Sequence, residues 1–243
     1  ELNNSLQWLG IPYAQPPEGS LRWKAPRALQ KNDKKIKATD FGNPCPQVAS
    51  ISIDRKEGGG YIGSEDCLYL NIFTPKNLDA DKKLPVMFWI HGGGNTSGEA
   101  GSYDFSKLAA AHDLVIVSVN YRLGFLGWFY HPSFAATSNS LEDKSGNFGT
   151  LDQIMALKWV RDNIEDFGGN KNNVTIFGES AGGHNVFALL SSKLATGLFH
   201  KAISQSGATN SFNLQEASMY SDNTDSSLLT SSKEIAVSYT HLR

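Results

Sequence analysis

The sequence has few of the residues that bind metals or nucleic acids. Its 243 residues include only two cysteines and six scattered histidines, at positions 91, 112, 131, 184, 200 and 241. A structural zinc site needs four ligands close together, so we expect no metal. The 22 Lys and Arg residues nearly balance the 24 Asp and Glu residues, which gives a net charge of −2. Because nucleic-acid-binding domains normally carry a basic excess, the composition argues against such a partner.

Long hydrophobic runs are also lacking. The most apolar stretch, residues 114–130, is interrupted by Asn120 and Arg122, whereas a membrane span needs about 18 or more apolar residues with few charges. The 23 glycines and 9 prolines follow no fixed period, which excludes collagen-like and low-complexity sequences. A chain of this length can bury roughly 70–75% of its unfolded surface, so we expect one globular domain.

The two ends of the sequence are unusual. The chain begins at Glu1 without a methionine, and we expect residues to be missing before it. Residues 211–236 are rich in serine and show little periodicity. Residues 237–243 read Val-Ser-Tyr-Thr-His-Leu-Arg, which matches the translation of a transposase adapter used for sequencing libraries. We interpret residues 237–243 as an adapter artefact, with a native tail as the alternative, and residues 1–236 as the native domain.

Short apolar runs alternate with segments of helical period after residue 83. The runs at 84–90, 114–120, 174–177 and 201–204 predict strands, and 106–112, 151–164 and 181–190 predict helices. Asp104 or Ser106 is the predicted cap of the helix at 106–112. Residues 1–80 are rich in Pro and Gly, and 61–73 is their most strand-like part. The alternation predicts an α/β fold with a mostly parallel central sheet and helices on both faces.

The segment Gly178-Glu179-Ser180-Ala181-Gly182 lies between a predicted strand and a predicted helix. A Gly-x-Ser-x-Gly sequence in this position is a nucleophile elbow, in which the serine occupies a strained turn and the glycines relieve crowding. The helix that follows offers free N–H groups and a positive dipole end to a developing oxyanion. A chain of this composition contains roughly 0.2 copies of the pattern by chance. The position of this copy between a strand and a helix is therefore the stronger argument.

The segment His91-Gly92-Gly93-Gly94 directly follows the predicted strand 84–90. The fraction of chains of this composition that would contain this segment by chance is roughly 0.005. Three glycines let the backbone approach a substrate closely and aim its N–H groups at one point. In proteins with a nucleophile elbow, such a loop and the residue after the nucleophile form the oxyanion hole. The alternative interpretation is an ordinary flexible loop.

Several segments together resemble the type-B carboxylesterases, the cholinesterase-like group. The resemblance spans nearly all of residues 8–208 and implies an α/β-hydrolase fold, here truncated before its C-terminal half. On this basis residues 1–236 are a partial carboxylesterase catalytic domain. The matching segments are Gly10-Ile11-Pro12-Tyr13-Ala14-Gln15-Pro16-Pro17, Glu65-Asp66-Cys67-Leu68-Tyr69-Leu70-Asn71-Ile72-Phe73-Thr74-Pro75, Val119-Asn120-Tyr121-Arg122-Leu123-Gly124, Gly146-Asn147-Phe148-Gly149 with Asp152-Gln153, and Phe167-Gly168-Gly169-Asn170 through Phe177-Gly178-Glu179-Ser180-Ala181-Gly182.

The resemblance implies a role for each residue of the site. Ser180 would be the acylated nucleophile, and the backbone N–H groups of Gly93, Gly94 and Ala181 would form the oxyanion hole. Each such donor lowers the barrier by ~2.7–4 kcal/mol. The implied reaction is carboxylic ester hydrolysis through an acyl-enzyme, on a small-molecule ester and without a cofactor.

Two further positions belong to the implied substrate site. Glu179 would lie beside the nucleophile and favour cationic charge nearby, and the alternative is a buried, hydrogen-bonded structural carboxylate. Asn95 stands where the family often has an aromatic residue that lines the acyl side of the pocket. Thr150, in place of a large aliphatic residue, is a smaller departure from the family.

Cys45 and Cys67 match the first disulfide of the family. A bond between them would imply an oxidising compartment, either extracellular or periplasmic. The alternative is a pair of buried reduced thiols in the cytosol. The Pro44-Cys45-Pro46 context is unlike a hydrophobic core and favours the disulfide.

A base for Ser180 is missing from the sequence. The order in this fold is Ser, then acid, then His, and only His184, His200 and His241 follow Ser180. The resemblance implies that both partners come from the absent C-terminal half, so we expect the fragment to be inactive. Peptidase and thioesterase chemistry are enzymatic alternatives. A non-catalytic, cholinesterase-like adhesion or scaffold protein is the alternative from another class. Nothing in the sequence indicates an oligomeric state.

Overall fold

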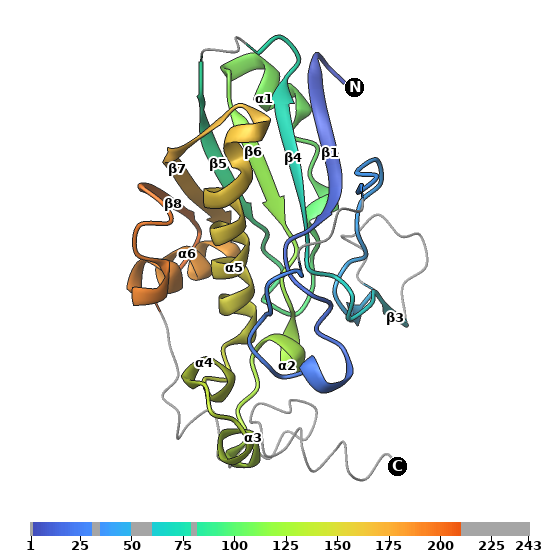
Figure 1. Ribbon diagram of the computed structural model, residues 1–243, viewed down its shortest axis with the longest axis vertical. Helices are drawn as coiled ribbons and strands as arrows, with labels where there is room; N and C mark the ends of the chain where they lie inside the picture. The colour runs from blue at the N-terminus through green and yellow to red at the C-terminus, as the bar shows by residue number, and fades with distance from the viewer. Residues whose placement is uncertain (1, 31–34, 50–59, 79–81, 210–243) are drawn as a thin grey trace.

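A computed structural model describes residues 2–30, 35–49, 60–78 and 82–209 of the chain (Figure 1). The interpretations of 211–236 and of 237–243 lie outside these residues. A six-stranded sheet has the strand order β1-β4-β6-β5-β7-β8, and a two-stranded sheet pairs β2 with β3. The strands are β1 (Ser5–Pro12), β2 (Gln47–Val48), β3 (Tyr61–Ile62), β4 (Tyr69–Pro75), β5 (Leu84–Ile90), β6 (Val115–Val119), β7 (Gly169–Glu179) and β8 (Lys201–Gln205).

Six α-helices and four short 3₁₀ helices connect the strands in the described part of the chain. The α-helices are α1 (Ser106–His112), α2 (Gly124–Gly127), α3 (Pro132–Thr137), α4 (Leu141–Lys144), α5 (Phe148–Asn163) and α6 (Ala181–Ser191). The 3₁₀ helices are η1 (Gly19–Leu21), η2 (Ala100–Ser102), η3 (Ile164–Phe167) and η4 (Lys193–Ala195).

The central strands are parallel, and the two strands at one edge are antiparallel. β5 pairs in parallel with β6 and β7, and β7 pairs in parallel with β8, whereas β4 is antiparallel to both β1 and β6. The chain leaves β5 toward β6 and then returns across β5 to reach β7. Since parallel crossovers are right-handed, these opposite steps place α1 and α5 on opposite faces of the sheet.

Two hydrophobic clusters cover the two faces of the sheet. Alternate side chains of β5 divide between them, because successive residues of a strand point to opposite faces. Val86 and Phe88 pack with α5 and α6, whereas Trp89 packs with Ala109 of α1. Figure 1 shows α5 running along one face of the sheet. The predicted mostly parallel sheet with helices on both faces is therefore confirmed.

The predicted elements are confirmed where the apolar pattern is strong. The strand 84–90 and the helix 106–112 have the predicted bounds. The cap of α1 differs from the prediction, because Phe105 occupies the N-cap position and Asp104, one residue earlier, accepts a hydrogen bond from the Ser106 N–H at 2.9 Å.

Three segments differ from the sequence-based prediction in length or number. The helix predicted at 151–164 begins earlier, at Phe148, and the strand predicted at 174–177 extends over the whole of β7. The polar residues at the start of β7 give no apolar signal, but Gly169 pairs with Leu84 of β5. The region 61–73 contains two strands, β3 and β4, and β1 was missed at the edge of the sheet.

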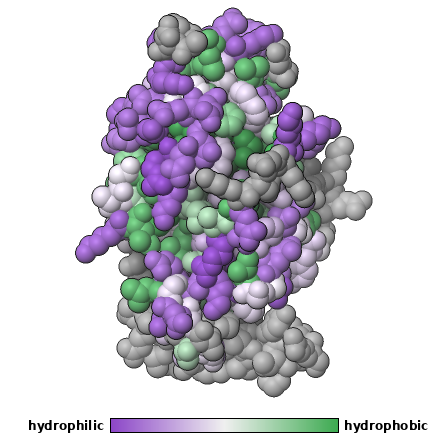
Figure 2. Space-filling model, viewed as in Figure 1, coloured by the Kyte–Doolittle hydropathy of each residue, from purple (hydrophilic) through white to green (hydrophobic). Residues whose placement is uncertain are grey.

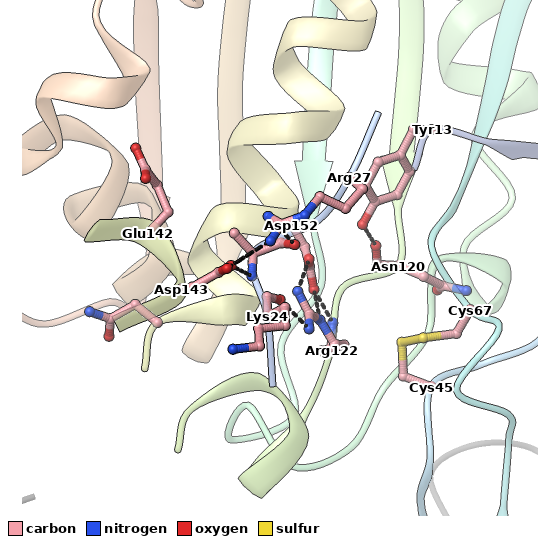
Figure 3. A network of polar contacts seen from close by, with 12 residues as sticks. Tyr13, Lys24, Arg27, Cys45, Cys67, Asn120, Arg122, Glu142, Asp143 and Asp152 are labelled. Atoms are coloured by element: carbon pink, nitrogen blue, oxygen red, sulfur yellow. Dashed lines mark hydrogen bonds and ion pairs between the residues drawn. A yellow bond between two sulfur atoms is a disulfide. The ribbon is translucent and has the colours of Figure 1, made fainter. Parts of the chain in front are cut away.

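A buried ion pair holds the segment after β6 against α5 (Figure 3). The guanidinium of Arg122 donates to both carboxylate oxygens of Asp152, at 2.8 and 2.7 Å, and the Arg122 N–H donates to the same carboxylate at 3.1 Å. Both side chains are almost fully buried. The remaining guanidinium nitrogen donates to the carbonyl of Lys24 at 2.8 Å, so the pair also binds the N-terminal segment.

Asp143 of α4 forms a second attachment for the N-terminal segment (Figure 3). Its carboxylate accepts hydrogen bonds from the Ala25 N–H, from Arg27 and from Ser138. Burial by itself raises the pKa of Asp143, but these hydrogen bonds outweigh burial and hold the pKa below its usual value.

Hydrophobic side chains are exposed near the outer edge of the sheet at β8. Ile203 of β8, Leu190 of α6 and Leu194 of η4 are each about half exposed. Figure 2 shows hydrophobic side chains lying between hydrophilic ones on the face that carries α5. Within the part of the chain that the structure describes, no helix has the length and apolar character of a membrane span.

Cys45 and Cys67 form the predicted disulfide, with their Cα atoms 5.0 Å apart. The bond joins the segment before β2 to the segment before β4 and closes a loop with a sequence separation of 22 residues. Both cysteines lie in the core. The alternative of two reduced thiols is therefore excluded for this structure.

We predict that reducing this disulfide lowers the free energy of unfolding by ~3 kcal/mol, because the unfolded chain then regains the entropy of the open loop. Urea denaturation with and without a reductant measures the change. The double variant Cys45→Ala/Cys67→Ala is the control, and its stability should not respond to the reductant. Equal stability of the reduced and oxidised chains would contradict the prediction.

Candidate active site

The pairing of β5 with β7 brings the glycine loop and the Gly-x-Ser-x-Gly turn together. Ile90, the last residue of β5, pairs with Gly178 near the end of β7. Because the strands are parallel, the segments that follow them leave the sheet at the same edge. Gly92 consequently lies against the serine, and a Cβ atom built on Gly92 would be 3.2 Å from the Cβ of Ser180.

Ser180 occupies a strained turn between β7 and α6. Its φ and ψ angles are 55° and −120°, a combination that residues with a Cβ atom rarely adopt. Its N–H donates to the carbonyl of Gln205 at 2.8 Å, so pairing with β8 supports the turn. The side chain is half-buried. Its hydroxyl has no hydrogen-bond partner among the described residues.

Glycines allow α6 to start directly against the end of β5. A Cβ on Gly182 would overlap the carbonyl oxygen of Ile90, and a Cβ on Gly178 would lie 2.9 Å from the same oxygen. Real Cβ atoms do not approach backbone this closely, so any larger residue would push the helix away from the strand. The two flanking glycines therefore determine how near Ser180 lies to the glycine loop.

The carbonyl groups of Gly92 and Gly93 in the glycine loop both accept hydrogen bonds from neighbouring residues. His91 Nδ1 donates to the Gly92 carbonyl at 2.8 Å, and the N–H groups of Thr96 and Ser97 donate to the Gly93 carbonyl at 3.0 Å. In a trans peptide the N–H points opposite to the C=O. The Gly93 and Gly94 N–H groups therefore face the other side, and neither donates to a residue that the structure describes.

Positive φ angles in the loop explain why glycine is needed there. Gly93 has φ 99° and Gly94 has φ 63°, which are conformations that glycine adopts without strain. Ala181 is the first residue of α6, so its N–H has no acceptor within the helix. The β5–β7 pairing thus brings together two segments that carry three N–H groups with no acceptor among the described residues.

His91 supports the loop from inside the protein. Its ring is buried and stacks on the ring of Tyr121, with centroids 4.3 Å apart. Burial lowers its pKa to about 4, and the hydrogen bond to Gly92 opposes that shift only in part. The ring is therefore neutral near pH 7, with the hydrogen on Nδ1. The Tyr121 hydroxyl donates to the His91 carbonyl at 2.5 Å.

The two residues suggested for the substrate site have different environments. Glu179 is exposed and has no hydrogen bond or ion pair with a described residue, so it is not the buried structural carboxylate of the alternative interpretation. Burial and then the charge of Glu179 raise the pKa of nearby Tyr103. The Asn95 amide faces Asn185 of α6 and exchanges two hydrogen bonds with it, at 2.9 and 3.4 Å.

None of the histidines after Ser180 that the structure describes contacts the hydroxyl. His184 Nδ1 donates to the Ser180 backbone carbonyl at 2.9 Å. His200 Nδ1 accepts from the Val174 N–H at 3.1 Å, in the middle of β7 and six residues before Ser180. His241 lies outside the described residues. The described residues also contain no group of three or more His, Cys, Asp or Glu side chains placed to hold a metal ion.

Sequence reasoning missed Asn185 and Tyr121 as parts of the site. Asn185 reads as an ordinary polar residue within the helix at 181–190, and Tyr121 as part of a family segment. No periodicity distinguishes them, because their role depends on contacts with residues about 30 to 90 positions away. Only the tertiary structure brings them to the loop.

A nucleophile elbow after one parallel strand, beside a glycine loop after its neighbour, is the arrangement of α/β-hydrolase enzymes. The chain belongs to the carboxylesterase family, whose model matches residues 2–230. The resemblance to the type-B carboxylesterases is therefore confirmed.

Similar proteins include carboxylesterases of animals and bacteria. Carboxylesterase 1D of Rattus norvegicus is 46% identical over 207 residues, which cover 82% of this chain and 35% of that protein. Para-nitrobenzyl esterase of Bacillus subtilis (strain 168) is 47% identical over 219 residues, which cover 88% of this chain and 42% of that protein. The solved structure of a thermophilic PNB esterase matches with a TM-score of 0.78 and 45% identity, over 87% of this chain and 42% of that one.

We predict that Gly182→Ala destabilises the chain by about 3 kcal/mol, because the new methyl group overlaps the Ile90 carbonyl. Urea denaturation measures the free energy of unfolding. Gly197→Ala is the matched control, since a Cβ there meets no atom within 4 Å. Its only cost is the positive φ, roughly 1 kcal/mol. Equal effects of the two substitutions would refute the argument from crowding.

We predict that stability falls as the pH is lowered from about 6.5 to about 4. In this range His91 stays neutral in the folded protein but takes up a proton in the unfolded chain, so the unfolded state binds more protons. The loss amounts to on the order of 3 kcal/mol.

Chemical denaturation at a series of pH values measures this loss. His91→Asn should remove that part of the pH dependence, because its amide donates to Gly92 without titrating. His112→Asn, at the exposed end of α1, should leave the dependence unchanged. The same pH dependence in His91→Asn as in the unmodified chain would show that another group titrates.

Proposed function

We propose that this chain is the nucleophile-bearing part of a serine carboxylesterase. The observation that carries the proposal is the strained Ser180 turn beside a glycine loop with unused N–H groups. An unpaired hydroxyl on a strained turn has no evident structural use, and strain of this kind persists at catalytic positions. The family of the chain makes carboxylic esters the substrate class.

The reaction has two half-reactions. A general base removes the proton of the Ser180 hydroxyl as its oxygen attacks the ester carbonyl, and the alcohol leaves with that proton. Water then attacks the acyl-enzyme and releases the carboxylic acid. The N–H groups of Gly93, Gly94 and Ala181 bind the oxyanion in both steps, and each contributes ~2.7–4 kcal/mol to lowering the barrier. These steps require no cofactor.

The base and its acid partner lie outside the described residues. His184 and His200 both use Nδ1 for the backbone. The chain spans 35–42% of the length of the relatives reported above, and we infer that a longer protein supplies the missing His and carboxylate. The 243-residue chain is then a fragment that holds the nucleophile and the oxyanion hole but cannot complete a turnover.

The surroundings of the site indicate where this protein works and what it binds. The Cys45–Cys67 disulfide favours an oxidising compartment, either extracellular or periplasmic. The exposed Glu179 carboxylate beside the site favours a neutral or cationic ester over an anionic one. A small-molecule ester fits the family better than a peptide does.

A non-catalytic adhesion or scaffold protein is the second candidate. Such a protein needs the shell of the fold but neither a reactive serine nor an oxyanion loop. Here both are present, and the loop is held by hydrogen bonds on its inner side. These features favour the enzyme.

We predict that the purified 243-residue chain hydrolyses an activated aryl ester no faster than buffer does, and that the complete protein hydrolyses it rapidly. Ser180→Ala in the complete protein should abolish turnover. A fluorophosphonate should label the complete protein at Ser180, as located by mass spectrometry.

Two results would contradict these expectations, the first for the inactivity of the 243-residue chain and the second for the proposed function itself. Turnover by the 243-residue chain that Ser180→Ala abolishes would show that the base lies within it. A folded complete protein that neither hydrolyses esters nor reacts with the fluorophosphonate would favour the scaffold protein. Ser191→Ala is the control, because this exposed serine of α6 contacts only the carbonyl of Phe187.

A further inference from the structure

Asn185 lies in the first turns of α6, five residues after Ser180, and is only 4% exposed. Its Nδ2 donates to Asn95 Oδ1 at 2.9 Å, and its Oδ1 accepts from Asn95 Nδ2 at 3.4 Å. The two amides thus face each other and exchange both a donor and an acceptor. The pair connects the helix of the nucleophile with the residue that directly follows the glycine loop.

Tyr121, which is also buried, holds the other end of the loop. Burial raises the pKa of the Tyr121 hydroxyl, so the hydroxyl keeps its proton and can donate it. The Tyr121 hydroxyl donates to the carbonyl of His91 at 2.5 Å. The loop is therefore held at both ends, by the Asn95–Asn185 pair at one end and by Tyr121 at the other.

The backbone at Asn95 depends on this support. Asn95 has φ 58°, a left-handed conformation that asparagine tolerates better than other residues with a Cβ. Its carbonyl accepts from the Gly124 N–H at 2.7 Å. Gly93 and Gly94 lie between two anchored ends, so their N–H groups have little freedom to turn away from Ser180. An aromatic residue at position 95 could not form the amide pair.

We propose that Asn185 is a positioning residue that fixes the end of the oxyanion loop through its amide pair with Asn95. This inference rests on the proposed esterase function. Asn185 touches neither the substrate nor the reacting atoms. It acts by holding the Gly93 and Gly94 N–H groups where the oxyanion forms. Its loss therefore weakens binding of the transition state more than binding of the ester.

The test uses the complete protein and an activated aryl ester. Asn95→Gly removes the side chain but keeps the left-handed backbone, and Asn185→Ala removes the other half of the pair. We expect each substitution to lower kcat by roughly 10²-fold, the effect of a misplacement of about 1 Å. KM should change by less than about threefold, because ester binding does not use the oxyanion contacts fully. The double variant should be no slower than the slower single variant, because both substitutions remove one interaction.

Asn71→Ala is the matched control. Asn71 is 3% exposed and also forms two side-chain hydrogen bonds, with the Gly10 N–H and with Ser118. It lies in β4, which is two strands away from β5. This control should lower the melting temperature about as much as Asn185→Ala does but leave kcat within about twofold of the unmodified protein.

The outcomes separate this inference from the proposed function. If the unmodified protein is active and Asn185→Ala lowers only the melting temperature, the residue is merely structural and the inference is wrong. A rise in KM at constant kcat would also overturn it, since it would place the pair in ester binding. If the folded, unmodified protein neither hydrolyses esters nor reacts at Ser180, the proposed function itself fails.

Discussion

The site depends on the close contact between the end of β5 and the start of α6. The parallel pairing of β5 with β7 sets Ile90 opposite Gly178, and Gly182 then lies against the Ile90 carbonyl with no room for a methyl group. The contact has two consequences. It forces the turn at Ser180 into an unusual backbone conformation, and it places the residues after β5 directly beside that turn.

Polar groups inside the protein complete what the packing begins. The neutral His91 ring and the Tyr121 hydroxyl bind carbonyl groups at the start of the glycine loop, and the Asn185 amide binds Asn95 at its end. The His91 ring and the Tyr121 hydroxyl each satisfy the carbonyl of a buried residue, which would cost on the order of 1–3 kcal/mol if left without a partner. The outer side of the loop keeps unused N–H groups. This division between a satisfied inner side and an unsatisfied outer side is what a preorganised oxyanion site requires.

The segment after β6 connects the glycine loop with α5 and with the N-terminal segment. The Arg122–Asp152 pair ties the segment after β6 to α5, and the carbonyl of Lys24 joins it. Because breaking a buried ion pair leaves an uncompensated charge, this region resists local rearrangement. The chain from β6 to α2 also supplies Tyr121 and the N–H of Gly124, which contact the start and the end of the glycine loop. The stability of the fold and the geometry of the loop are therefore coupled.

The sequence by itself determined the central strands, the main helices and the identity of the elbow and loop, because their signals are local. A continuous apolar run such as 84–90 is typical of a buried strand, and Gly-x-Ser-x-Gly between a strand and a helix is typical of the nucleophile elbow. It did not determine the polar start of β7, the edge strand β1 or the environment of Glu179, because pairing partners and solvent exposure are not encoded locally. The amide pair of Asn95 and Asn185 was decided only by the tertiary structure. Two residues that are 90 positions apart form a hydrogen bond only after the sheet has set the loop and the helix side by side.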